Sequence, residues 1–490
     1  MKSRTTFVVL WLLILCALGF ELAIADRGFE ITDEGMALVA AAAPEEIRIA
    51  PTGFAWTTGP LFSLVGHEPA AFRRAGVLVL ALCGSVLAWG VTRRVPSLSL
   101  REAAPLGALG ALVFLDPGLT LPSYNFVASC GSSLAIGLFL AASADRGRRA
   151  AWLFVSSGFA LGVAGLAKPP GGVGIGLLLA SSAFFWRWSW RPAFWVSGGA
   201  LAVAQQLARQ GPGDFATMVM DGLEFNRRLE GGYGLGSMAS RYSAEWLRII
   251  ANAFLIAIPA LVVLYVARRF FTDHKHPATR LVWLALGASL VLQGAHAGGH
   301  RPATSGRSAA AIGAILLVVA VETARAKRDP PRRRLALLLL AAPLLALIGT
   351  NTPVGFSVMF FCAPWFLVPA VLQDDSTPSP GGAILAAMAV GFLVQGPFFS
   401  PYRRAPLSEM TASVQVGAAG ARLKVDPETA RFLRAYRGAA LSCGLRPGTP
   451  ILAFSWVPGL VWAAGGRTAG ITHFVNGFFP GARSANEFAL

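Results

Sequence analysis

The chain has 490 residues, of which 54% are hydrophobic and only 14% are charged, and its formal net charge is +17 at pH 7. Soluble domains usually carry about 25% charged residues, so this composition excludes an ordinary water-soluble protein and favours one that lies in lipid. Most of the excess Lys and Arg falls between hydrophobic runs, which indicates membrane anchoring and argues against nucleic-acid binding.

Apolar runs long enough to cross a bilayer, roughly 17–25 residues each, recur along the chain. They predict an all-α polytopic membrane protein with about 13 transmembrane helices over residues 1–398. The first run is interpreted as a span and not as a cleaved signal peptide, because no A-x-A cleavage pattern is evident. The predicted spans are 6–25, 74–92, 104–121, 124–143, 151–167, 170–186, 193–210, 248–267, 281–297, 308–324, 335–350, 355–372 and 382–398.

The sidedness of these spans follows from the loops between them. Short loops rich in Lys and Arg usually stay in the cytoplasm. With the N-terminus in the cytoplasm, the inner loops carry basic clusters at 93–101, 146–149, 187–191, 268–280 and 325–334. Odd-numbered spans then run outward, and the C-terminus lies outside.

Three polar regions fall on the outer side in this orientation. The loop 26–73 mixes acidic and weakly apolar stretches, which favours short helices on the membrane surface. The loop 211–246 contains a glycine-rich stretch. The tail 399–490 is too polar to span, and a helix-like segment from Asp426 followed by a β-like run from Pro450 predicts a small α/β extracytoplasmic domain.

Asp33 and Glu34 form a carboxylate pair a few residues beyond the first span. Two adjacent carboxylates at a membrane surface can deprotonate a hydroxyl or hold a metal ion. A structural role is the alternative, because Thr32 or Asp33 could cap a helix over residues 36–43.

Lys168 stands at the outer junction of two predicted spans, directly before Pro169-Pro170. Ionisable residues at membrane depth are costly and mostly functional, and a cation at this place could hold a phosphate anion. The alternative is a lysine that snorkels to the interface.

Further basic residues on the outer side could together surround an anionic lipid headgroup, although each alone fits a solvated charge. They are Arg73, Arg74, Arg227, Arg228, His300 and Arg301. The sequence contains no P-loop, GxSxG elbow, HExxH or Rossmann fingerprint, which argues against an ATP-driven pump. No metal site and no required cofactor are predicted, although Mg²⁺ or Mn²⁺ is compatible with the carboxylate pair.

In order and sidedness, these features resemble the C-type (GT-C) superfamily of integral membrane glycosyltransferases, which includes protein mannosyltransferases and lipid A aminoarabinose transferases. The resemblance rests on short segments: Asp33-Glu34-Gly35, Gly59-Pro60, the run from Leu64 to Arg74, Pro122-Ser-Tyr-Asn125, Gly162–Lys168, Ser455–Leu460 and Gly465–Arg467. The chain departs from many members at Trp56-Thr-Thr-Gly-Pro60, where a His or Tyr is usual.

The resemblance implies a hexosyl- or pentosyltransferase of the cell inner (plasma) membrane. Such an enzyme would move a sugar from a polyprenyl-phosphate donor to a lipid, glycan or protein acceptor on the extracytoplasmic face. It implies Asp33 as the general base and Glu34 as a second carboxylate. The implied phosphate-binding residues are Lys168, Arg73, Arg227, Arg301 and His300, and the implied substrate-lining residues are Trp56, Tyr124 and Asn125.

A secondary transporter or lipid flippase is the alternative function. Transporters tend to show broken helices at matching positions in two halves, and only one break, at Lys168-Pro-Pro, is visible. Acidic residues within the spans are nearly absent, which leaves little for ion coupling. A non-catalytic scaffold for envelope assembly is a third possible function.

Overall fold

The computed structural model describes residues 4–115, 120–229, 240, 242–247, 251, 329–349, 354–373, 381–399, 405–453, 456–471 and 481–489. Three predicted spans, at 248–267, 281–297 and 308–324, lie outside the described residues apart from Ala251, and so do His300 and Arg301.

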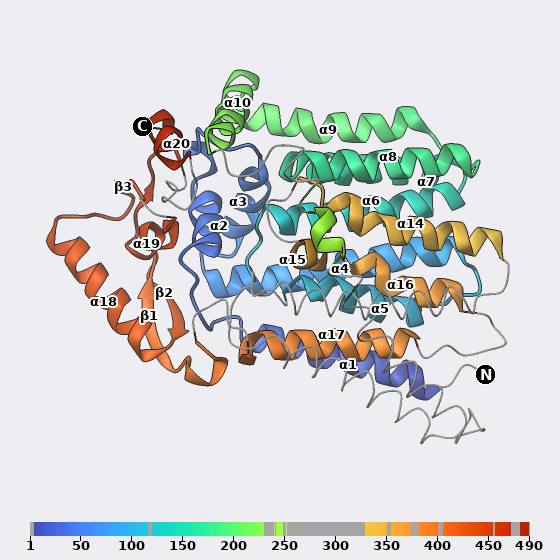
Figure 1. Ribbon diagram of the computed structural model, residues 1–490, viewed down its shortest axis with the longest axis horizontal. Helices are drawn as coiled ribbons and strands as arrows, with labels where there is room; N and C mark the ends of the chain where they lie inside the picture. Colours follow the sequence, from blue (N-terminus) through green and yellow to red (C-terminus); the bar gives the residue numbers. More distant parts are fainter. Residues whose placement is uncertain are drawn as a thin grey trace.

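The described part of the chain is mostly helical, and its apolar helices lie side by side with their long axes roughly aligned (Figure 1). They are α1 (Arg4–Ala23), α4 (Pro69–Arg94), α5 (Leu100–Leu112, continued by the 3₁₀ turn η2, Val113–Leu115), α6 (Tyr124–Ala144), α7 (Gly147–Ala167), α8 (Pro169–Phe185), α9 (Pro192–Gln210), α14 (Pro330–Ala346), α15 (Val354–Met359), α16 (Ala363–Leu372) and α17 (Gly381–Phe399). By length and composition, α4, α6 and α7 are candidate membrane spans. The count of 13 stays a prediction.

The exterior of this bundle is suited to lipid. Leu82, Val173, Leu177 and Phe184 are each more than 60% exposed, and water would penalise so much apolar surface. Inside, small residues let helix backbones approach closely, as in membrane helix pairs. A Cβ atom on Gly90 of α4 would lie only 2.0 Å from the carbonyl oxygen of Gly137 on α6.

One span expected to be continuous is broken. The sequence predicts a helix over 355–372, but the structure has α15 and α16 separated by Phe360, Phe361 and Cys362. Pro364 occupies the first turn of α16. Proline lacks the N–H that a continuous helix would require there and is well tolerated only at a helix start. The break brings Phe361 next to Lys168, as described below.

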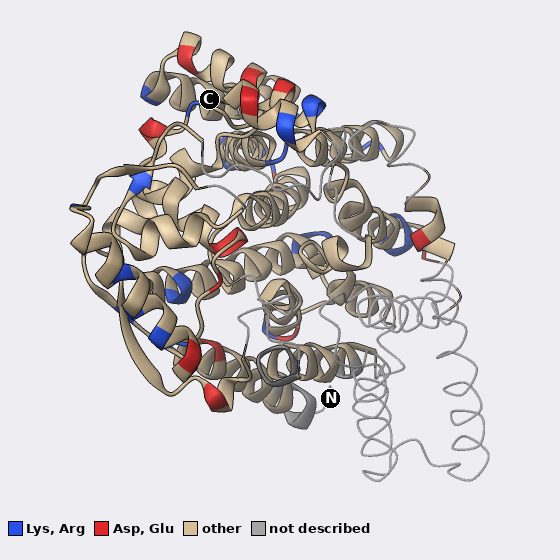
Figure 2. Ribbon diagram, turned by 60° about the vertical axis from the view of Figure 1, so that its left-hand side comes forward, with Lys and Arg blue, Asp and Glu red and all other residues tan. Residues whose placement is uncertain are grey.

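The polar elements gather at one end of the bundle, where the C-terminus also lies, and the N-terminus lies at the opposite end (Figure 1). Those before the tail are α2 (Asp33–Ala42), the 3₁₀ turn η1 (Pro44–Glu46), α3 (Phe54–Leu64) and α10 (Pro212–Arg228). The tail adds η3 (Leu407–Glu409), β1 (Ala412–Val416), β2 (Ala421–Val425), α18 (Pro427–Ser442), β3 (Pro450–Ile451), α19 (Pro458–Ala463), β4 (Arg467–Thr468) and α20 (Ala482–Ala489). Figure 2, turned to bring this end forward, shows acidic and basic residues spread over it.

The tail shares a hydrophobic core with the first loop. β1 and β2 pair antiparallel, with Val414 opposite Leu423. Both side chains are buried in one cluster with Phe29 and Leu38 of the first loop and Trp462 of the tail. The Gly28 N–H donates to the Lys424 carbonyl over 2.7 Å, and the Lys424 N–H donates to the Asp26 carbonyl over 2.8 Å. The tail is therefore seated directly on the segment that carries Asp33 and Glu34.

Candidate functional site

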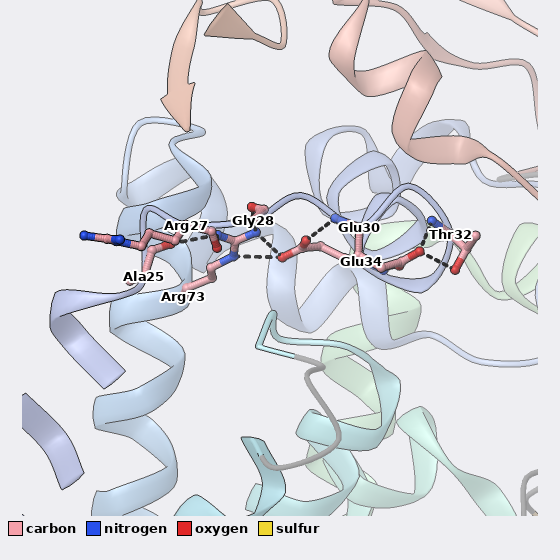
Figure 3. Close-up of polar contacts among 7 residues, drawn as sticks. All are labelled: Ala25, Arg27, Gly28, Glu30, Thr32, Glu34 and Arg73. Carbon is pink, nitrogen blue, oxygen red and sulfur yellow. Dashed lines mark hydrogen bonds and ion pairs between the residues drawn. The ribbon is translucent and has the colours of Figure 1, made fainter. Parts of the chain in front are cut away.

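Glu34 and Arg73 form a buried ion pair that ties α2 to the start of α4 (Figure 3). Arg73 Nη2 lies 2.6 Å from Glu34 Oε1, and the two side chains are 1% and 3% exposed. The second carboxylate oxygen, Oε2, accepts the Glu30 N–H over 2.9 Å. Both oxygens of Glu34 thus hold the first loop in place. We therefore infer that Glu34 positions this loop and does not react itself.

Arg73 also holds the backbone of the first loop. Its Nη1 donates to the carbonyls of Ala25 and Arg27, and its Nη2 donates to the carbonyl of Gly28 (Figure 3). Its Nε donates to Glu34 Oε1. No nitrogen of this guanidinium is left without an oxygen partner, so the implied phosphate-binding role of Arg73 does not fit this arrangement. The residue instead fixes the path of the chain after α1.

Glu30 is a buried carboxylate that the sequence analysis did not single out. Its Oε1 accepts the Thr32 N–H over 2.6 Å and the Thr32 hydroxyl over 2.5 Å, and its Oε2 accepts the Glu34 N–H over 2.8 Å. Glu30 thereby satisfies N–H groups at the start of α2. The structural alternative considered from the sequence gave this capping role to Thr32 or Asp33. Burial raises the pKa of Glu30 to about 7.

Asp33 is the first residue of α2 and is partly exposed. The N-terminal end of a helix favours negative charge, so a carboxylate suits this position. The tail borders this helix end, because the Gly459 N–H donates to the Ile31 carbonyl over 2.8 Å. A Cβ atom on Gly35 would lie 2.2 Å from the Gly459 nitrogen, so the two backbones touch. Asp33 therefore lies where the first loop meets the tail.

Lys168 is buried between the end of α7 and the start of α8. It is 4% exposed, and within the described part of the chain its Nζ has no hydrogen-bond partner. Its neighbour is the ring of Phe361, whose centroid lies 4.6 Å from Nζ. An aromatic face attracts a cation but accepts no ordinary hydrogen bond. A lysine that snorkels to the interface would keep its ammonium in water, and the burial of Lys168 does not fit that alternative.

Tyr124 and Asn125 begin α6, close to the same junction. Asn125 is 3% exposed, and its Oδ1 has no hydrogen-bond partner among the described residues. One turn further on, the Ser129 hydroxyl donates to the Phe360 carbonyl over 2.5 Å. Because Phe361 contacts Lys168, these contacts connect the first turns of α6 to the buried lysine.

Trp56 lies on α3, and the start of α3 contacts the segment just before Lys168. The Gly53 N–H donates to the Leu166 carbonyl, two residues before Lys168, over 2.9 Å. The rings of Phe54 and Tyr124 are 6.2 Å apart. The Trp56 indole Nε1 is buried and, among the described residues, has no acceptor. Trp56 on α3, Tyr124 and Asn125 on α6, and Lys168 at the junction of α7 and α8 thus lie at the same end of the bundle.

The start of α6 also approaches the Glu34–Arg73 pair. A Cβ atom on Gly76, one turn after Arg73 on α4, would lie 3.3 Å from the Pro122 side chain. The loop before α6 is therefore in contact with the helix that carries Arg73. The carboxylate group around Asp33 and the buried lysine share this end of the bundle. The start of α6 is linked to the lysine through Phe360 and Phe361.

Arg227 lies apart from this group. It is 73% exposed on α10, and its Nε lies 2.6 Å from Glu224 Oε2. Hydrogen bonds from Arg227 and Arg228 lower the pKa of Glu224 to about 2. α10 contacts α9 and α20, so the structure does not bring Arg227 to Lys168. In the described ranges no group of three or more His, Cys, Asp or Glu side chains could hold a metal ion.

No protein-family model and no curated protein matches the sequence. A crystal structure of ArnT from Cupriavidus metallidurans bound to undecaprenyl phosphate is similar to this chain, with 16% sequence identity and a TM-score of 0.46. The match covers 99% of this chain and 88% of that chain. Because the identity and the TM-score are low, the function proposed below rests on the residues of this chain.

Proposed function

We propose that the chain is an integral membrane glycosyltransferase that moves a sugar from a polyprenyl-phosphate donor to an acceptor hydroxyl. The observation that carries this proposal is the buried ammonium of Lys168, which has no hydrogen-bond acceptor within the described residues and lies at the bundle end that also holds Asp33. Burying a charge without a counter-ion is costly and is usually retained for function. An anionic group of a substrate would supply the hydrogen-bond acceptor and the counter-charge that the Lys168 ammonium needs.

The donor phosphate is the anion that suits Lys168. In the transfer, the acceptor oxygen bonds to the anomeric carbon of the sugar while the bond from that carbon to the phosphate oxygen breaks. The leaving polyprenyl phosphate gains negative charge, which a desolvated ammonium stabilises more strongly than one in water. The apolar exterior of the helices allows the polyprenyl chain to stay in lipid throughout.

Asp33 is the proposed base that takes the proton of the acceptor hydroxyl. Glu34 and Glu30 are held by hydrogen bonds to Arg73 and to the backbone, so they support the loop on which Asp33 stands. Trp56, Tyr124 and Asn125 are proposed to line the path of the sugar, with the indole as a stacking surface and Asn125 Oδ1 as an acceptor for a sugar hydroxyl. We place this site on the extracytoplasmic face, following the Lys and Arg distribution.

The test is a transfer assay with the full-length protein in liposomes and a radiolabelled polyprenyl-phosphate sugar. Release of polyprenyl phosphate together with labelled acceptor supports the enzyme. We expect Asp33→Asn to abolish transfer, whereas Asp214→Asn, which also neutralises an exposed aspartate in the first turn of a helix, keeps it. Full activity of Asp33→Asn would overturn the assignment of the base.

A further inference from the structure

The opposite end of the bundle carries a second group of unpartnered donors. Arg94 is the last residue of α4, and its guanidinium carbon lies 4.1 Å from the ring centroid of Trp188 in the loop between α8 and α9. Figure 1 places the end of α4 and the turn from α8 to α9 at the end that also holds the N-terminus. This group is therefore separated from Lys168 by the length of the bundle.

Within the described part of the chain, three side-chain nitrogens at this end of the bundle have no hydrogen-bond acceptor. Arg94 Nε, Arg94 Nη2 and Trp190 Nε1 are buried, and no oxygen of the described residues accepts a hydrogen bond from them. The Trp188 ring interacts with the face of the guanidinium, but the N–H groups point outward in the guanidinium plane and need acceptors of their own. A buried donor without a partner is costly, and a charged one more so.

The loop that carries the tryptophans is held in a defined shape. Arg187 has a φ of +54°, in the left-handed region that a non-glycine residue rarely adopts. The Trp188 N–H donates to the Ala183 carbonyl over 3.0 Å, which closes the end of α8 and turns the loop back toward α4. The Trp190 ring packs 6.0 Å from that of Trp195 on α9. Trp188 and Trp190 are thus fixed by backbone and ring contacts.

The charge around this group is strongly positive. The segments 93–99, 145–149 and 186–191, which cover helix ends and the loops beside them, hold seven arginines and a single acidic residue, Asp145. Asp145 Oδ2 lies 3.7 Å from Arg93 Nη2 and 3.2 Å from Arg149 Nε, so its charge is already shared by those two. Tryptophan is enriched at the level of lipid headgroups, where its ring is in apolar surroundings and its N–H meets polar ones.

We propose that Arg94, Trp188 and Trp190 form a binding site for the phosphodiester group of an anionic phospholipid. Arginine suits this ligand because its planar fork of N–H groups matches two phosphate oxygens at once. The Trp190 N–H supplies a further donor to the phosphate, and the surrounding arginines favour a lipid with net negative charge over a zwitterionic one. The site is independent of the glycosyltransferase proposal, since it shares no residue with that site.

The test measures lipid retention by the full-length protein with native mass spectrometry, adding dioleoyl-phosphatidylglycerol or dioleoyl-phosphatidylcholine. We expect saturable, preferential retention of phosphatidylglycerol. Arg94→Gln should weaken it about tenfold, the equivalent of losing a charged hydrogen-bond pair. Trp190→Phe keeps the ring contact with Trp195 and removes only the N–H, so it should weaken retention by a smaller factor. Elution profile and thermal unfolding in phosphatidylcholine check that each variant is folded.

Arg149→Gln is the matched control, because it removes one positive charge at the same end of the bundle. The Arg149 side chain is 63% exposed and paired with Asp145. It should weaken phosphatidylglycerol retention much less than Arg94→Gln does, because Arg149 contributes only to the surrounding charge and not to the proposed contacts. Equal weakening by Arg149→Gln and Arg94→Gln would mean that only diffuse charge matters and would overturn the proposal, as would an unchanged affinity in Arg94→Gln. In a third arm, inorganic phosphate is added to protein that already carries phosphatidylglycerol. Displacement of the lipid by phosphate at a similar concentration would overturn the lipid assignment.

Discussion

Arg73 Nη2 and Glu34 Oε1 lie 2.6 Å apart in the interior of the protein, although 39 residues separate them along the chain. Removing one member of a buried pair leaves an uncompensated charge, which costs about 3–5 kcal/mol. We therefore expect Arg73→Gln and Glu34→Gln each to lower the unfolding temperature markedly in detergent. The double variant Arg73→Gln/Glu34→Gln should recover part of the loss. A double variant that is as unstable as the sum of the single ones would contradict the pairing.

Lys168→Met should separate activity from stability. The substitution removes a buried charge that no described acceptor compensates and keeps a similar side-chain volume, so the unfolding temperature should stay equal or rise. Transfer should fall by roughly 10²-fold, the usual effect of removing one preorganised donor to developing charge. Thermal unfolding and the liposome transfer assay measure the two effects. Arg209→Met, in an exposed residue of α9 that donates to the Trp56 carbonyl, is the comparison and should retain most of the transfer.

Glu30 should make stability depend on pH. Its pKa is raised from 4.5 to about 7 in the folded protein by burial, so between these values the folded state binds more protons than the unfolded state. Its contribution to the free energy of unfolding is therefore fully present below about pH 4.5 and is lost as the pH rises through about 7. The maximum contribution is roughly 3 kcal/mol. Glu30→Gln should remove this part of the slope between pH 4.5 and 7. If the free energy of unfolding changed equally with pH in the original protein and in Glu30→Gln, the role given to Glu30 would be refuted.

Gly35→Ala should dislodge the tail from the first loop. A methyl group at this position would lie 2.2 Å from the Gly459 nitrogen, and backbone on both sides leaves it no room. We expect faster proteolysis of the tail and a loss of transfer of roughly 10²-fold, because small displacements at a reacting centre have effects of that size. Gly438→Ala, within α18 and with nothing within 4 Å of the added atom, should leave both unchanged.

The hydrophobic pattern was sufficient to locate the apolar helices. Predicted spans such as 74–92, 124–143 and 151–167 coincide with α4, α6 and α7, because backbone groups in lipid must be satisfied within the segment. The junction at Lys168 could also be predicted, since Pro169-Pro170 must begin a new helix. The break between α15 and α16 was missed, although Pro364 provided a local signal for it.

The candidate site could be predicted only in part. Asp33, Lys168, Trp56, Tyr124 and Asn125 are recognisable as polar or aromatic residues beside apolar runs, and the structure gathers them at one end of the bundle. Nothing in the pattern distinguishes Glu34, whose oxygens are fully engaged, from its neighbour Asp33. Glu30 was overlooked because its role depends on the chain turning back over the start of α2.

The sequence by itself therefore determined that this is a membrane protein, where most of its described helices run, and which residues deserved attention as chemical groups. These follow from interactions within a few residues, namely apolar periodicity, proline and the cost of charge in lipid. Only the tertiary structure decided which carboxylates hold the first loop, that the tail is seated on that loop, and that Lys168 is buried beside Phe361. Those relationships join residues far apart in the chain, and their energies depend on desolvation and contact geometry that no local pattern records.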